Sequence, residues 1–181
     1  MDYKEKGYNN KMKIPIVNEQ DEIIGYKDRK DRNTTDITRI TGLWLWNEKR
    51  EVLLAQRGFD KSINPGLWGP AVAGTVEEGE TYESNIIKEA EEEIGLKNLK
   101  PVLGPKLRRT TKHAYFAQWF TVTINSDYPL IKQDSEVESI KWFSWDEIFK
   151  AFDETPGVFL PSLKESAEYF FKHEPKSKKT S

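Results

Sequence analysis

The alternation of apolar and polar positions along the chain predicts strands on both sides of a central acidic segment. Residues 14–29 alternate as two short strands around a turn at residues 18–21. Residues 37–57 predict a β-hairpin, because a β-branched and aromatic run meets a polar turn at residues 47–50 before a second apolar run. Residues 62–74 contain too many Gly and Pro residues for regular structure except at their last few positions. Further strands are predicted at residues 101–110, 114–125 and 138–144.

Helical periodicity is clearest between Glu80 and Ile94, where apolar residues recur at steps of three and four: Tyr82, Ile86, Ile87, Ala90 and Ile94. Gly79 precedes this segment, and Gly95 supplies a C-terminal stop. Two more helices are predicted at residues 145–154 and 161–174. The resulting order of four strands, a helix, three strands and two helices implies an α/β fold in which helices cover a mixed β-sheet.

The length of 181 residues favours one domain, which we assign to residues 13–173. The polar, lysine-rich residues 1–12 are expected to form a flexible arm, and residues 174–181 a flexible basic tail. The chain has no apolar run of about 20 residues and no apolar N-terminal stretch typical of a signal peptide. We therefore expect a cytoplasmic protein with no membrane partner.

Composition excludes several kinds of site. The net charge of −2 gives no basic field for a nucleic-acid polymer. The chain has no cysteine, so disulfides, thiolate nucleophiles and cysteine metal sites are excluded, and two histidines cannot make a histidine-rich metal site. A small-molecule partner is expected, and a homodimer is left open.

The segment from Gly74 to Leu96 is rich in glutamate, although like charges at helical spacing repel one another. Glu89, Glu92 and Glu93 stand at i, i+3 and i+4 and therefore lie side by side on a helix. Three such carboxylates oppose each other's ionisation unless a cation lies among them, and their oxygen atoms suit Mg²⁺. A solvated acidic face is the alternative, but it would not require the glycines that bracket the segment.

The spacing in this segment resembles the Nudix box: Gly, five residues, Glu, seven residues, Arg-Glu, an aliphatic residue, any residue, Glu-Glu, any residue, Gly. Six of its seven fixed positions match, and Lys88 replaces the Arg. Ala90 is also smaller than the usual aliphatic residue. Segments outside the box resemble the same family, and residues 17–25 resemble its branch related to isopentenyl diphosphate isomerase. The matching positions are Gly74, Glu80, Glu89, Glu92, Glu93 and Gly95.

The resemblance implies a Nudix-like α/β/α sandwich with a mixed β-sheet and Mg²⁺-dependent hydrolysis of a nucleoside diphosphate derivative or a related organic diphosphate. Mn²⁺ is expected to be able to replace Mg²⁺. Glu89, Glu92 and Glu93 are the expected metal ligands, and the structural positions of the box are Gly74, Glu80, Lys88 and Gly95. In this family the general base is a box glutamate or one on a late loop, so the catalytic candidates are Glu92, Glu93 and Glu136. For Glu136, a solvated loop acid is the alternative.

Three arginines are candidates for binding substrate phosphate. Arg57 ends a predicted strand shortly before the box, while Arg108 and Arg109 form a basic pair on a later strand. An ordinary surface arginine is the alternative for each. Aromatic residues could stack on a base, although strand aromatics more often belong to the core: Trp44, Trp46, Trp68, Tyr82, Trp119 and Trp142. His113 is expected to lie in a loop without a role.

Two other functions stay open. The first is isomerase activity, but by resemblance type 1 isopentenyl diphosphate isomerases use a cysteine that this chain lacks. The second is a non-catalytic Nudix domain that senses a nucleotide. Such domains usually lose box glutamates, which are all present here.

Overall fold

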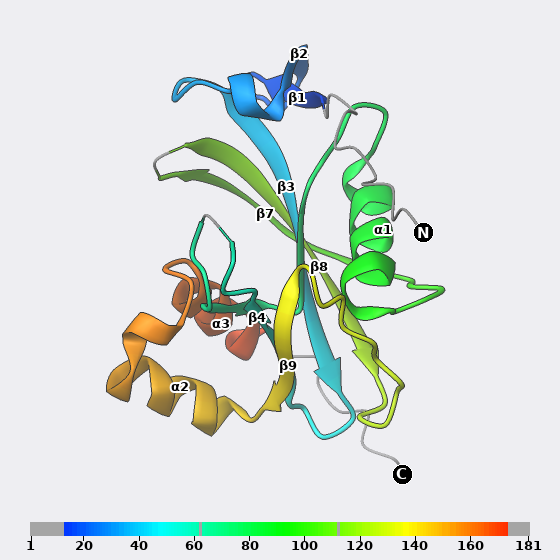
Figure 1. Ribbon diagram of the computed structural model, residues 1–181, viewed down its shortest axis with the longest axis vertical. Helices are drawn as coiled ribbons and strands as arrows, with labels where there is room; N and C mark the ends of the chain where they lie inside the picture. The colour runs from blue at the N-terminus through cyan, green and yellow to red at the C-terminus, as the bar shows by residue number, and fades with distance from the viewer. Residues whose placement is uncertain (1–12, 62, 112, 174–181) are drawn as a thin grey trace, which may run out of the picture.

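Strand β3 organises the sheet in this computed structural model, which describes residues 13–61, 63–111 and 113–173 (Figure 1). The predicted arm and tail, residues 1–12 and 174–181, lie outside the described residues. The described strands are β1 (Lys13–Val17), β2 (Ile23–Asp28), β3 (Ile37–Asn47), β4 (Val52–Arg57), β5 (Trp68–Pro70), β6 (Val72–Thr75), β7 (Val102–Thr110), β8 (Ala114–Ile124) and β9 (Val137–Phe143). The helices are α1 (Tyr82–Ile94), α2 (Trp145–Glu154) and α3 (Leu163–Lys172), with short 3₁₀ segments η1 (Arg29–Asp31) and η2 (Pro156–Val158).

The sheet is mixed because β3 has both parallel and antiparallel neighbours. β3 and β8 run parallel over the whole length of β3, from the Ile37↔Ala114 pair to the Asn47↔Ile124 pair. β1, β4 and β6 pair antiparallel with β3. β7 extends the sheet beyond β8, and β2 extends it beyond β1. This arrangement confirms the mixed sheet predicted from the order of elements.

The predicted hairpin of β3 and β4 forms, but its two strands soon diverge. They pair only at Leu45↔Leu53 and Trp46↔Val52, next to the turn. Beyond this point β4 pairs with β9 and β5 instead. The splayed hairpin therefore leaves room along β3 for β6, the strand that leads into the acidic helix.

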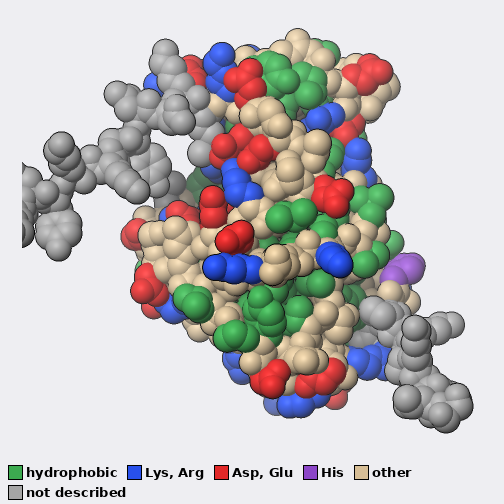
Figure 2. Space-filling view, turned by 90° about the vertical axis from the view of Figure 1, so that its right-hand side faces the viewer, with side chains coloured by type: hydrophobic (Ala, Val, Ile, Leu, Met, Phe, Trp, Pro, Cys, Tyr) green, Lys and Arg blue, Asp and Glu red, His purple; other side chains and the backbone are tan. Residues whose placement is uncertain are grey.

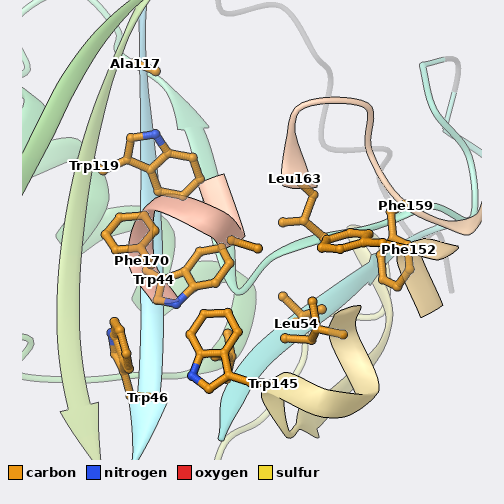
Figure 3. Packing of buried hydrophobic residues seen from close by; sticks show 13 residues of the cluster. Trp44, Trp46, Leu54, Ala117, Trp119, Trp145, Phe152, Phe159, Leu163 and Phe170 are labelled. Atoms are coloured by element: carbon orange, nitrogen blue, oxygen red, sulfur yellow. The ribbon is translucent and has the colours of Figure 1, made fainter. Parts of the chain in front are cut away.

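Side chains of β3 point alternately to two cores, which makes the fold an α/β/α sandwich. Leu43 and Leu45 pack in one cluster with α1 residues such as Ile86. Trp44 and Trp46 pack on the opposite face with α2 and α3, and Figure 3 shows these rings around Phe170 and Trp145. The Trp44 and Phe170 ring centroids lie 4.8 Å apart in a stacked arrangement. The predicted fold class is confirmed. Among the described helices, none has the length and the apolar character of a membrane span.

Local signals fix both ends of α1. Thr81 adopts an extended conformation, and its hydroxyl accepts a hydrogen bond from the Ser84 backbone N–H in a capping box. The helix therefore begins at Tyr82, two residues after the predicted start. At the other end Gly95 has a φ of 68°, and its N–H donates to the Glu91 carbonyl at 3.1 Å, as in an αL C-cap motif.

Candidate active site

A polar pocket of about 320 Å³ opens between α1, β6 and the loop that precedes β9. Figure 2 faces the α1 side of the molecule and shows acidic side chains interspersed with Lys and Arg across the middle of this face. Most of the predicted site residues come together here. The pocket is lined by Arg29, Arg57, Ala73, Gly74, Thr75, Glu77, Lys88, Glu89, Glu92, Glu93, Gln133 and Glu136.

Gly74 allows α1 to lie directly against the sheet. It pairs with Thr41 in the β3–β6 ladder, under the helix. A Cβ atom at this position would lie 2.5 Å from Glu89 Cγ and 2.8 Å from Asn85 Oδ1. Because real Cβ atoms do not approach so closely, the box glycine keeps the helix and its glutamates near the strand.

Glu80 is held by several donors before α1 begins. Lys88 Nζ lies 2.6 Å from its Oε1 atom, and the Glu77 backbone N–H donates to its Oε2 atom at 2.9 Å. Asn85 Nδ2 also donates to Oε2 at 2.9 Å. Burial alone would raise the pKa of Glu80, but these donors outweigh it, so its pKa lies below the ordinary value. Glu80 is therefore an ionised anchor for the loop that enters the helix.

The pKa values of Glu89 and Glu93 shift in the opposite direction from that of Glu80, since burial raises the pKa of each carboxyl. The pKa of Glu89 rises to about 6 through burial and the repulsion of neighbouring acids including Glu92, although Lys88 partly offsets the rise. The pKa of Glu93 rises to about 8 through burial and the charge of Glu89, although a hydrogen bond from the Ala73 backbone opposes it. Such carboxylates favour a cation among them.

The donor chemistry of this pocket fits a hard divalent cation. Glu89, Glu92 and Glu93 offer only carboxylate oxygens, the ligands that Mg²⁺ takes in proteins. Within the described residues, no three His, Asp or Glu side chains are already close enough to form a complete metal site. Mg²⁺ suits this arrangement because it binds through one or two carboxylates and keeps water or phosphate oxygens for its other positions.

The loop before β9 brings Glu136 to the same pocket and is attached to the end of α1. The Ile131 N–H donates to the Ile94 carbonyl at 2.9 Å, and the Gln133 N–H donates to the Glu93 carbonyl at 2.8 Å. Lys61 Nζ lies 2.8 Å from Glu136 Oε2. The helix that carries the acidic cluster thus also fixes the position of Glu136.

Two arginines bring positive charge to this acidic pocket. Arg57 lies at the end of β4, and its Nε–H donates to the Ile63 carbonyl at 3.1 Å. Arg29 begins η1, on a segment far from the box in sequence. Carboxylates and guanidinium groups facing one cavity can bind a metal ion and phosphate oxygens together.

Comparison with known proteins identifies the family. The profile described as NUDIX domain matches residues 36–163. The chain belongs to the Nudix family. The resemblance predicted from the box is therefore confirmed.

Several relatives agree with this assignment. The isopentenyl-diphosphate Δ-isomerase of Enterobacter sp. (strain 638) is 26% identical over 157 residues, covering 82% of this chain and 85% of the relative. The solved structure of DR0079 from Deinococcus radiodurans has a TM-score of 0.74 at 22% identity, covering 87% of this chain and 98% of that one. The MutT protein of Methanosarcina mazei Go1 has a TM-score of 0.65 at 19% identity, covering 80% and 100% respectively.

This Nudix domain is a pyrophosphohydrolase, and all the glutamates of its box are present. Its solved neighbours share the fold, which agrees with the three layers described above. The isomerase relatives agree with the branch predicted from residues 17–25.

Arg108 and Arg109 do not reach the pocket of the Nudix domain. Two nitrogen atoms of Arg108 bind the Glu19 carboxylate at 3.0 and 2.9 Å, and Arg109 pairs with Glu165. The six aromatic candidates do not line the pocket either. Trp44, Trp46 and Trp119 are buried in the core, as the alternative held.

Sequence analysis missed Arg29 and Gln133, which line the pocket, and Lys61, which pairs with the pocket residue Glu136. Each lies in a polar, charged stretch with no pattern that marks it. Asn85 was also missed, although a buried asparagine inside an apolar helical stripe is a signal that could have been noticed. His113 lies in the loop between β7 and β8, where its carbonyl accepts the Thr111 N–H, and it does not line the pocket.

Proposed function

We propose that this enzyme hydrolyses the diphosphate linkage of a nucleoside diphosphate derivative or a related organic diphosphate, with Mg²⁺ as its cofactor and Mn²⁺ as a substitute. The observation that carries the proposal is a pocket in which the half-buried side chains of Glu89 and Glu93 lie together with two arginines. Glu89 and Glu93 are costly to bury as anions without a cation, and their raised pKa values express that cost.

Each group in the pocket then has a chemical task. Glu89, Glu92 and Glu93 would hold Mg²⁺, which when bound neutralises diphosphate charge and polarises the phosphorus centre. Arg57 and Arg29 would bind phosphate oxygens by charge-assisted hydrogen bonds. Their position beside the acidic cluster orients the linkage to be broken.

Glu136 is our choice for the general base, because it faces the pocket from outside α1 and is oriented by Lys61. It would accept a proton from the attacking water as the water oxygen bonds to phosphorus. The bridging oxygen leaves with the electron pair of the broken phosphorus–oxygen bond. Glu93 is the other candidate base, and Glu136→Gln distinguishes them, since it should abolish turnover while leaving Mg²⁺ binding unchanged.

A panel of diphosphates tests the proposal directly. Nucleoside diphosphate sugars, dinucleoside polyphosphates, coenzyme A and isopentenyl diphosphate would be incubated with enzyme and millimolar Mg²⁺, and the products separated by chromatography. We expect at least one to be hydrolysed and excess EDTA to stop the reaction. Undiminished turnover in EDTA would refute the metal requirement, and binding without hydrolysis would indicate a sensing domain instead.

Isomerase activity is the second candidate because of the relative that bears that name. The chain has no cysteine to take the part that the resemblance assigns to one. Incubation with isopentenyl diphosphate in deuterated water should therefore give no deuterium incorporation into carbon. Metal-dependent incorporation would establish the isomerase instead.

A further inference from the structure

Asn85 is a fully buried amide on α1, with an exposed fraction of 0%, that lies between two glutamates of the box. Its Nδ2 atom lies 2.9 Å from Glu80 Oε2 and 3.3 Å from Glu89 Oε1. The same nitrogen lies 3.2 Å from the Thr75 carbonyl oxygen. Asn85 therefore connects the anchor carboxylate Glu80 with the candidate metal ligand Glu89.

The acceptors around this amide determine its orientation, because the Thr75 carbonyl and the ionised Glu80 carboxylate can only accept hydrogen bonds. The Thr41 hydroxyl, which is also buried, donates to Asn85 Oδ1. The Nδ2 atom therefore faces these acceptor oxygens and shares its two N–H groups among Thr75, Glu80 and Glu89. The donors are thus fixed before any metal binds.

Because residue 88 is lysine, a second side chain is needed to bind both oxygens of the Glu80 carboxylate. The family motif has Arg here, and a guanidinium holds a carboxylate with two parallel N–H bonds, which an ammonium group cannot reproduce. Lys88 Nζ reaches Oε1 of Glu80 at 2.6 Å, whereas Asn85 binds the other oxygen, Oε2. Together the two side chains bind both oxygens of Glu80.

We propose that Asn85 is a positioning residue that shares with Lys88 the task of the family arginine and extends it to Glu89. The amide holds Glu80 in place and directs one oxygen of Glu89, so that the remaining Glu89 oxygen faces the pocket. This inference rests on the proposed function, because it assigns Glu89 to the metal. It predicts that Asn85 matters more when residue 88 is lysine than when it is arginine.

A double-mutant cycle tests this dependence. The parent, Asn85→Ala, Lys88→Arg and the double variant would be compared by kcat, KM and the Mg²⁺ concentration that gives half-maximal turnover. Partners that orient a metal ligand typically contribute 10–100-fold to metal affinity, so Asn85→Ala should raise the required Mg²⁺ by about 10-fold. In the Lys88→Arg background the increase should fall to about threefold or less.

Ile86→Val is the matched control, because Ile86 is the next residue of α1, is equally buried and belongs to the apolar cluster beneath the helix. It should lower the unfolding temperature without changing the Mg²⁺ requirement. Asn85 has no positioning role if Asn85→Ala, like Ile86→Val, leaves the Mg²⁺ requirement unchanged. The same holds if Asn85→Ala raises the Mg²⁺ requirement equally with lysine and with arginine at position 88. If Asn85→Ala folds only with Lys88→Arg, that rescue supports the proposal, and if it folds with neither, Asn85→Ser takes its place in the cycle.

A readout without substrate separates this inference from the proposed function. The rise in unfolding temperature on adding Mg²⁺ would be measured for the same four proteins. If no diphosphate is hydrolysed but Mg²⁺ stabilises the parent more than Asn85→Ala, the proposed function fails and the positioning role stands. If hydrolysis occurs and the four proteins show additive effects, the positioning role fails alone.

Discussion

Substitution of Gly74 by alanine tests whether the close approach of α1 to the sheet builds the site. The added Cβ atom would lie 2.5 Å from Glu89 Cγ, 2.8 Å from Glu89 Cδ and 2.8 Å from Asn85 Oδ1. None of these atoms can move freely, because Asn85 is fully buried and hydrogen-bonded and the two Glu89 atoms belong to a half-buried side chain next to Gly74. The helix or the Glu89 side chain must therefore shift.

Overpacking of this kind costs about 1–3 kcal/mol of unfolding free energy. For a chain of this size, that loss corresponds to a fall in unfolding temperature of roughly 2–12 °C. The shift also displaces Glu89, so the Mg²⁺ requirement should rise and kcat should fall. Urea unfolding and turnover at several Mg²⁺ concentrations measure both effects.

Gly25→Ala is the control for the loss of a strand glycine, because no atom lies within 4 Å of the added Cβ. It should leave stability unchanged or raise it by up to about 1 kcal/mol. A second comparison uses Glu89→Ala, which removes two of the three clashing atoms. Adding Gly74→Ala to Glu89→Ala should lower the free energy of unfolding by less than adding it to the parent. The reasoning is refuted if Gly74→Ala matches the parent in stability and Mg²⁺ requirement, or if its cost is unchanged without Glu89.

Three further predictions follow from the pocket. Glu93→Gln should lower turnover by roughly 10²–10⁴-fold, whereas Glu91→Gln, on an exposed position outside the pocket, should be nearly neutral; equal losses would contradict the assigned face. In the metal-free protein, burial raises the pKa of Glu93 from 4.5 to about 8, so the folded state holds a proton that the unfolded chain has lost. The free energy of unfolding should therefore fall between pH 4.5 and 8, and in urea titrations with EDTA Glu93→Gln should flatten this slope. Arg57→Ala should lower kcat/KM by about 10–100-fold through the loss of a bond to a charged group, while Arg109→Ala should not, because Arg109 pairs with Glu165 away from the pocket.

The elements of this fold that could be predicted are those specified by nearby residues. The apolar stripe of α1 and its terminal Gly95 are visible in one short segment, although the cap Thr81 falls inside the helix predicted from Glu80. β5 was missed as a strand because Gly and Pro fill two of its three positions, whereas most of β6 falls in the last few positions of residues 62–74, where regular structure was allowed. The pairing of β5 with β4 and of β6 with β3 is decided by residues distant in sequence. The same dependence explains why the early divergence of β3 and β4 could not be foreseen.

The same distinction applies to the candidate site: arrangements set by local spacing could be predicted, whereas contacts between residues distant in sequence could not. The box spacing alone brings Glu89, Glu92 and Glu93 to one side of α1, and they line the pocket. Arg108 shows the limit of such reasoning, because its partner Glu19 is 89 residues away in sequence and no local pattern indicates the pair. Arg29 reaches the pocket for an equally non-local reason, through the folding of η1 next to the box.

The attachment of the late loop to α1 has a consequence for how relatives of this chain can vary in length. Backbone hydrogen bonds from the Ile131 and Gln133 N–H groups to the Ile94 and Glu93 carbonyls fix the start of the late loop next to the proposed metal ligands. Residues added at the surface turn between Asn125 and Tyr128 precede these hydrogen bonds in sequence and therefore leave Glu136 in place. Residues added between 133 and 136 would carry the proposed base away from the pocket. Insertions and deletions accepted during evolution should therefore accumulate before Ile131, while the distance from Ile131 to Glu136 stays constant.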